Sequence, residues 1–118
     1  MTDDVLRHMR DALHLGDDEI PVFYGMFLRT FESAVEGLRG AFANPSRPDF
    51  LAIRSATHSL VGFSRNIGAV DLGDAAKALN AAAHAGDAAA CALGASDIEE
   101  LYRHYRDGAP NPGGTETR

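Results

Sequence analysis

His58 is the residue whose neighbours in the sequence point most directly to chemistry. At about 100° per residue of an α-helix, His58 lies about 200° from Leu60, so it faces away from the apolar stripe that includes Leu60. Gly62 follows one turn later, inside a helix, where glycine costs about 1 kcal/mol relative to alanine. A glycine at that position leaves room for another molecule to approach the imidazole.

The helix surface around His58 carries both positive charge and apolar groups. Arg54 lies one turn before the histidine and Arg65 two turns after it, so both could pair with anionic oxygens carried on a ring nitrogen. A neutral imidazole is a competent nucleophile near neutral pH. The pattern favours a phosphate-accepting histidine, and a solvated histidine beside an incidental glycine is the alternative. The residues expected within about 60° of His58 are Leu51, Arg54, Ser55, Val61, Gly62 and Arg65.

This histidine belongs to a predicted helix with recognisable ends. Asp49 is a suitable N-cap, and Gly68 is suited to end the helix in the left-handed conformation. Its expected inward positions are Phe50, Ile53, Thr57, Leu60, Phe63, Ser64 and Ile67.

Two helices are predicted before it. The first covers residues 3–15 and ends at Gly16, and the second is capped by Asp17 or Asp18 and runs to the proline-containing loop at 44–48. The second helix has apolar residues at helical spacing for about five turns. Its expected inward positions are Phe23, Met26, Phe27, Phe31, Ala34, Val35, Leu38 and Phe42.

Helical patterns also follow the histidine helix. One runs over residues 70–85, a short helix over 88–93 is expected to stop before Gly94, and a capping box at Ser96–Glu99 is expected to open a last helix. No segment alternates like a strand. The sequence therefore predicts an all-α fold, an antiparallel four-helix bundle with an additional N-terminal helix, over residues 1–106. Residues 107–118 are expected to be a disordered tail.

Composition excludes several classes of function. The chain has 118 residues with 11 Lys and Arg against 17 Asp and Glu, a net charge of −6, and so has room for one domain. The acidic balance disfavours binding of nucleic acid or of an anionic membrane. Neither a secretion signal nor a run of about 18 apolar residues is present, so we expect a cytoplasmic protein. ATP binding is disfavoured because no glycine-rich loop follows a strand.

The other chemically active residue types fit no site. Cys91 is the single cysteine and has no basic neighbour, so a buried structural thiol is expected. The remaining histidines show no metal-ligand spacing, and solvated helix faces are the better interpretation. No cofactor and no metal of its own are therefore expected. These histidines are His8, His14, His84 and His104.

Segment 53–69 resembles the histidine-containing phosphotransfer (HPt) domain of bacterial two-component phosphorelays. The most specific part is His58-x-Leu60-x-Gly62 followed by Gly68-Ala69, in the predicted helix and on its predicted outer face. The next helix, with its closing Gly86-Asp87, is also similar to the family, as are the preceding helix and loop. The resemblance covers nearly the whole domain.

The resemblance implies a phosphorelay intermediate and not an enzyme with its own ATP or kinase site. His58 would be phosphorylated by a receiver-domain aspartate, or through a histidine kinase or hybrid kinase pathway, and would pass the group to a response regulator. Gly62 would leave room for the receiver, and Leu51 and Val61 would form the apolar docking surface. The Mg²⁺ that such transfers need would be bound by the receiver.

Two departures from the family pattern keep alternatives open. The family usually has lysine where this chain has Val61, and Arg54 or Arg65 are expected to supply that charge. The frequent glutamate of the next helix is Asn80 here. A second hypothesis is therefore a module that docks a receiver or kinase without being phosphorylated. A third is a bundle that self-associates through Leu51 and Val61, although a monomer is expected.

Overall fold

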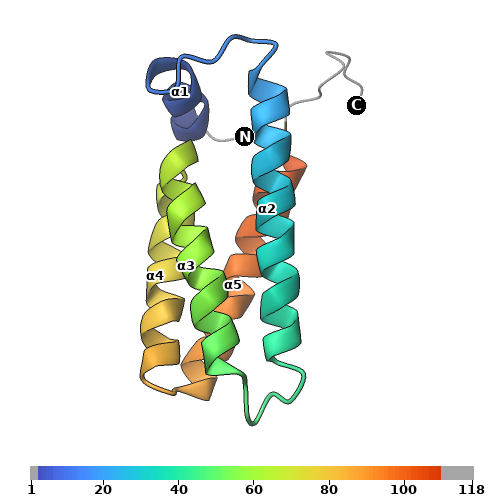
Figure 1. Ribbon diagram of the computed structural model, residues 1–118, viewed down its shortest axis with the longest axis vertical. Coiled ribbons are helices and arrows are strands. Elements are labelled where there is room, and N and C mark those ends of the chain that lie inside the picture. The colour runs from blue at the N-terminus through green and yellow to red at the C-terminus, as the bar shows by residue number, and fades with distance from the viewer. Residues whose placement is uncertain (1–2, 110–118) are drawn as a thin grey trace.

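The computed structural model describes residues 3–109, which fold into an all-α bundle without strands (Figure 1). Helices α2 to α5 run alternately up and down and form the four-helix bundle, and α1 lies across one end of it, against α3. The predicted all-α architecture is thus confirmed. The helices are α1 (Asp3–Asp11), α2 (Ile20–Ala41), α3 (Phe50–Ile67), α4 (Val70–His84) and α5 (Ala88–Asp107).

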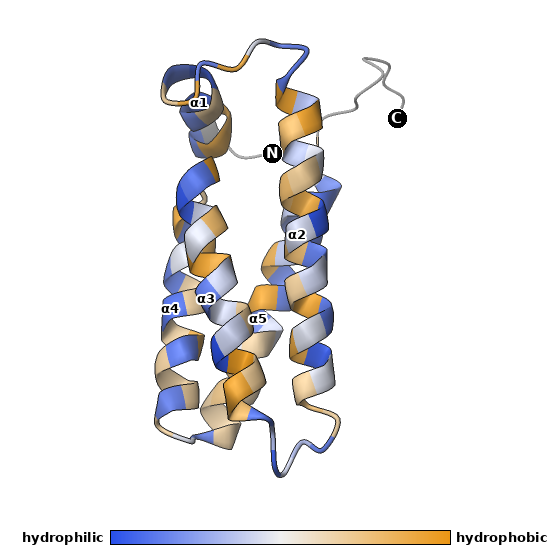
Figure 2. Cartoon of the chain, viewed as in Figure 1, coloured by the Kyte–Doolittle hydropathy of each residue, from blue (hydrophilic) through white to orange (hydrophobic). Residues whose placement is uncertain are grey.

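Each helix of the bundle buries one apolar stripe and turns polar residues to the outside (Figure 2). Aromatic rings from three helices meet in the core at the end of the bundle nearer α1. Five ring pairs, with centroids 5.2–6.3 Å apart, join α2 to its neighbours: Phe27 pairs with Phe63 of α3 and Tyr105 of α5, and Phe31 pairs with these two and with Tyr102 of α5. Tilted and edge-to-face rings at these distances add specific attraction to the hydrophobic burial. This cluster fixes how α2, α3 and α5 lie against one another.

Helix α3 begins and ends where the sequence predicts. The Asp49 side chain accepts a hydrogen bond from the Ala52 backbone N–H at 3.1 Å, which caps the first turn. Gly68 ends the helix with φ of 78°, in the left-handed region that side chains disfavour. Because only Gly68 and Ala69 separate α3 from α4, the two helices form a tight hairpin.

Two contacts set the register of the α3–α4 hairpin. The Thr57 hydroxyl donates a hydrogen bond to Asn80 Oδ1 at 3.1 Å. Nearer the turn, Ser64 packs on Gly73 so closely that a Cβ at Gly73 would lie 3.0 Å from Ser64 Oγ. Residue 57 is therefore level with residue 80, and residue 64 with residue 73.

The predicted break in the last helix is wrong, because α5 is continuous from Ala88 to Asp107. Gly94 does not end a helix; a Cβ there would lie 3.0–3.2 Å from Leu79 side-chain atoms, so the glycine permits close packing of α5 on α4. Asp87 caps the helix by accepting from the Ala90 N–H at 3.0 Å. Glu99, the expected capping-box partner, instead binds Arg39 of α2.

Other differences lie at helix ends. Helix α1 ends at Asp11, not at residue 15, and His14 in the following loop has a positive φ of 56°. Helix α2 starts at Ile20 without a side-chain cap from Asp17 or Asp18. Helix α5 extends one residue into the predicted tail, and residues 110–118 of that tail lie outside the described residues. Within residues 3–109, no helix is long and apolar enough to cross a membrane.

Candidate functional site

His58 lies near the middle of α3 and is exposed, between the fully buried Thr57 and the fully buried Leu60. Burial of these two residues fixes the rotation of α3 about its own axis, so the outward direction of the histidine follows from the packing of the core. Its ring forms no hydrogen bond or ion pair with any residue between 3 and 109. Both ring nitrogens are therefore available to an external group.

Gly62, one turn after His58, is exposed and adjoins empty space. A Cβ placed on it would meet no atom within 4 Å, whereas Cβ atoms on Gly73 and Gly94 would press on neighbouring side chains. Packing within the chain therefore explains Gly73 and Gly94; it does not explain Gly37 and Gly40 of α2, which also meet no atom, nor Gly62. An incoming molecule that must approach the α3 backbone beside His58 would explain it.

Two arginines on α3 add positive charge near the histidine. Arg54 is half-buried and Arg65 is exposed. Four ion pairs join described residues, and none of them includes either arginine. Their charge is not neutralised by a carboxylate of the described chain and can act on an anion bound at His58.

The two apolar residues predicted to face outward are placed differently. Leu51 is 73% exposed, as expected for a contact surface. Val61 is half-buried: it packs against the core on the flank beside α4, and its remaining surface lines a groove between α3 and α4. The reason is its position on the helix, about 100° from Leu60, which brings it to the flank that α4 covers.

A shallow groove between α2 and α3 adjoins the site and was not predicted. Its volume is about 350 Å³, and small side chains leave it open. Ser55 and Ser59, the neighbours of His58 on α3, belong to its wall. The sequence contains a signal for this groove, because the small residues that line it on α2 recur at helical spacing. The lining residues are Thr30, Ser33, Ala34 and Gly37 of α2 and Ala52, Ser55, Ala56 and Ser59 of α3.

The same face of α2 continues into exposed apolar surface. Met26 lies one turn before Thr30 and is 53% exposed, and Val22, a further turn away, is 63% exposed. Met26 was predicted to point inward; the structure corrects this, because Phe27 occupies the core position instead. A partner that covers the groove can therefore also contact Met26 and Val22.

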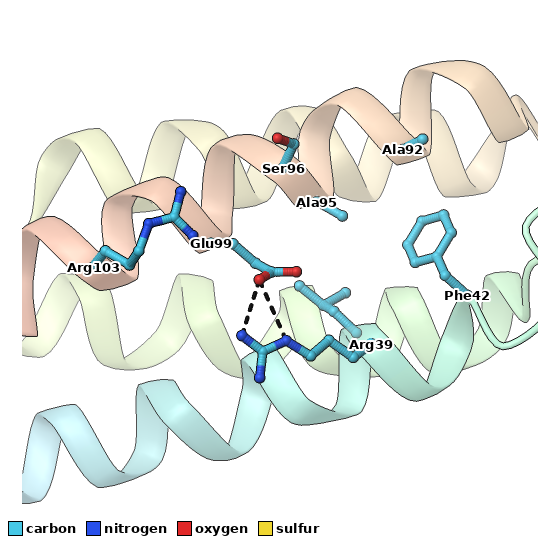
Figure 3. A pocket seen from close by; sticks show the side chains of 8 residues that line it. Arg39, Phe42, Ala92, Ala95, Ser96, Glu99 and Arg103 are labelled. Atoms are coloured by element: carbon cyan, nitrogen blue, oxygen red, sulfur yellow. Dashed lines mark hydrogen bonds and ion pairs between the residues drawn. The ribbon is translucent and has the colours of Figure 1, made fainter.

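A second groove, between α2 and α5, is chemically different (Figure 3). Its volume is about 370 Å³, and Arg39 donates from Nε and Nη2 to one oxygen of Glu99 at 3.3 and 3.0 Å. The Glu99 carboxylate raises the pKa of Arg39. Because its main cation is already paired and His58 is not part of it, this groove offers no second phosphate-accepting site.

Other reactive residue types serve the fold. Cys91 is buried, and burial, together with the nearby Asp87, raises the pKa of its thiol, so it is a poor nucleophile. The His8 ring forms a hydrogen bond of 3.0 Å with the Asn66 carbonyl oxygen. In the described part of the chain, no three His, Cys, Asp or Glu side chains are grouped to hold a metal ion.

The bundle thus presents His58, an exposed histidine without a partner among the described residues, beside a glycine whose Cβ position is open. The chain matches the family model of the Hpt domain over residues 22–108, and it belongs to that family. Domains of this family are phosphocarrier modules of histidine phosphotransfer in phosphorelays. The match covers α2 from its third residue and all of α3, α4 and α5, and α1 precedes it. No curated protein and no solved structure matches the chain.

Proposed function

We propose that this chain is a phosphorelay intermediate that accepts a phosphoryl group on His58 from a receiver-domain aspartate and passes it to a second receiver. The observation that carries the proposal is the exposed His58 ring, unpaired within the described chain, beside the open space at Gly62. Membership of the Hpt family supports the same role.

The reaction requires little more than positioning and charge. An unprotonated nitrogen of His58 attacks the phosphorus of the aspartyl phosphate; a P–N bond forms, and the P–O bond breaks as the carboxylate leaves with its electron pair. Transfer to the next receiver is the reverse reaction at a different aspartate. In this type of transfer, charge on the three phosphoryl oxygens is the main quantity to stabilise. Arg54 and Arg65 are the cations that α3 offers for it.

The receiver supplies what this chain does not carry. In the proposal, the Mg²⁺ ion is bound by carboxylates of the receiver, and no cofactor binds to this chain. The receiver covers His58, enters the space at Gly62 and rests on Leu51 and the α2–α3 groove. A histidine kinase or hybrid kinase is the source of phosphate upstream of that receiver.

The test is phosphoryl transfer from a receiver labelled with ³²P in the presence of Mg²⁺. Label on this chain should be acid-labile and base-stable, as phosphohistidine is, and His58→Gln should abolish it. His104→Gln, at an exposed histidine of α5, is the matched control and should retain full labelling. Undiminished labelling of a folded His58→Gln variant would show that another residue is the acceptor.

Docking without phosphorylation is the second candidate, favoured by Val61 in the place of the family's lysine. It predicts a receiver that binds this chain with unchanged affinity in the wild type and His58→Gln, yet transfers no label to either. Detection of phosphohistidine on the wild type would exclude this candidate.

A further inference from the structure

A groove between α3 and α4 brings a cation from another helix to the side of the His58 site. The groove has a volume of about 350 Å³, and its walls include Val61 and Arg65 of α3 and Lys77 of α4. Lys77 is the only lysine of the 118-residue chain. It is exposed, and no ion pair or hydrogen bond of its side chain with another described residue is present.

The register of the α3–α4 hairpin determines which part of α3 Lys77 faces. Thr57 is level with Asn80 and Ser64 with Gly73, so Lys77 is level with Leu60. Leu60 is buried, and the residue next to it on the flank toward α4 is Val61. Lys77 therefore projects beside Val61, as their shared groove confirms.

His58 lies on the same flank of α3. Counted from Leu60 at about 100° per residue, Val61 lies at about 100°, Arg65 at about 140° and His58 at about 160°. All three angles are on the side of α4, and residues three apart on a helix, such as His58 and Val61, are surface neighbours. A lysine beside Val61 has a flexible four-carbon stem with which to reach a group carried on His58.

We propose that the Lys77 ammonium pairs with the phosphoryl oxygens on His58, so that α4 supplies the charge that the family's lysine supplies from α3. This inference rests on the proposed function. Val61 suits the arrangement because a valine leaves the groove open, whereas a lysine there would place two ammonium groups side by side. Asp74, one turn before Lys77, lines the same groove without an ion pair to it.

The experiment measures phosphorylation of His58 by phosphoramidate, a small donor that needs no receiver. The wild type is compared with Lys77→Met, which keeps the stem and removes the charge, and with the double variant Val61→Lys/Lys77→Met, which returns an ammonium from α3. Arg103→Met, on the α2–α5 face, removes one positive charge away from the site and is the control for net charge.

Lys77→Met should lower the initial rate about fivefold, as expected for the loss of one charge-assisted contact in an exposed site. The double variant should recover most of the wild-type rate, and Arg103→Met should be phosphorylated at the wild-type rate. Added salt should reduce the difference in rate between the wild type and Lys77→Met, because it screens the charge of the ammonium. Wild-type rates in Lys77→Met would overturn the inference. A loss that the double variant does not recover would also overturn it, because it would show that Lys77 acts through the fold. If the wild type is not phosphorylated on His58 at all, the proposed function fails first and this inference with it.

Discussion

At the scale of single residues, the helical glycines fall into positions that close packing requires and positions that it does not. Gly73 and Gly94 allow α4 to pack closely against Ser64 of α3 and against α5, respectively. Gly62 has no such neighbour. Glycine is nevertheless unfavourable inside a helix, because it loses more conformational freedom on folding than other residues do. Gly37 and Gly40 of α2 are equally open, so Gly62 is distinguished by its place one turn after His58, where open space gives a partner access to the ring.

We therefore expect Gly62→Ala to stabilise the protein by about 0.5–1 kcal/mol and to slow phosphoryl transfer from a receiver. Urea unfolding measures the first effect, and the transfer assay measures the second. Gly40→Ala is the control, because Gly40 is also exposed in a helix with no atom near its Cβ position. It should not slow transfer, and equal transfer rates in both variants would contradict a role for Gly62 in receiver access.

Tyr24 provides a residue-scale prediction about pH. Its hydroxyl donates to the Tyr105 carbonyl oxygen at 2.8 Å in the core, and burial, together with Asp71, raises its pKa well above the ordinary value. The unfolded chain ionises this tyrosine near pH 10 and the folded chain does not. The contribution of Tyr24 to stability is thus complete below pH 10 and declines as the pH rises further.

Tyr24→Phe should cost about 1 kcal/mol at pH 7, because the buried carbonyl oxygen loses that donor. The difference in unfolding free energy from the wild type should shrink between pH 10 and 11, since the phenylalanine variant lacks the ionising group. Urea unfolding at the two pH values tests this. A constant difference would mean that Tyr24 ionises as easily in the folded state as in the unfolded one.

At the scale of elements, α1 packs on the end of the bundle through the buried Val5 and Met9, and His8 binds it to the end of α3. The His8 ring bonds to the Asn66 carbonyl, and His8 Cβ would lie 2.6 Å from a Cβ on Gly68. Gly68 also has a positive φ, so it meets two separate requirements. Gly86, with φ of 68° and no atom near its Cβ position, meets only the conformational one.

The pair Gly68→Ala and Gly86→Ala separates these requirements. Gly86→Ala should cost about 1 kcal/mol, the strain of a left-handed alanine, and Gly68→Ala should cost distinctly more because His8 must also move. Urea unfolding gives the two values, and amide chemical shifts should show α1 displaced only in Gly68→Ala. If both variants lose the same unfolding free energy and α1 is undisturbed, the His8 side chain moves aside without destabilising the protein.

The elements also show which features a sequence reveals. The ends of α3 were predicted because the signals at Asp49 and Gly68 are local. The continuity of α5 was not, because Gly94 resembles a helix stop until Leu79 of α4 is packed against it. The exposure of His58 follows from helical periodicity alone, whereas the half-burial of Val61 depends on where α4 lies.

At the scale of the whole molecule, the net charge of −6 bears on association. Copies of the chain repel one another, and the exposed apolar side chains are spread over four helices as Val22, Met26, Leu51, Val70 and Leu93. Scattered apolar residues of this kind do not form the large patch of a stable dimer. The unpaired cations near His58 instead offer a local attraction for an acidic partner surface.

We expect sedimentation equilibrium to give the mass of one chain at all concentrations in the micromolar range. Leu51→Ser should leave that mass unchanged and weaken receiver binding several-fold, because a 73% exposed leucine contributes to contact but not to the core. A mass that rises with concentration and falls back in Leu51→Ser would instead support self-association through this face.

The two-residue turn between α3 and α4 has a consequence for any change in the length of this chain. One residue inserted after Gly68 would rotate all of α4 by about 100° and move Lys77 out of the groove beside Val61. The same insertion after Gly86 would leave the α3–α4 hairpin unchanged. Under the proposed pairing of Lys77 with a phosphoryl group on His58, the length of this turn therefore determines whether the two residues can act together.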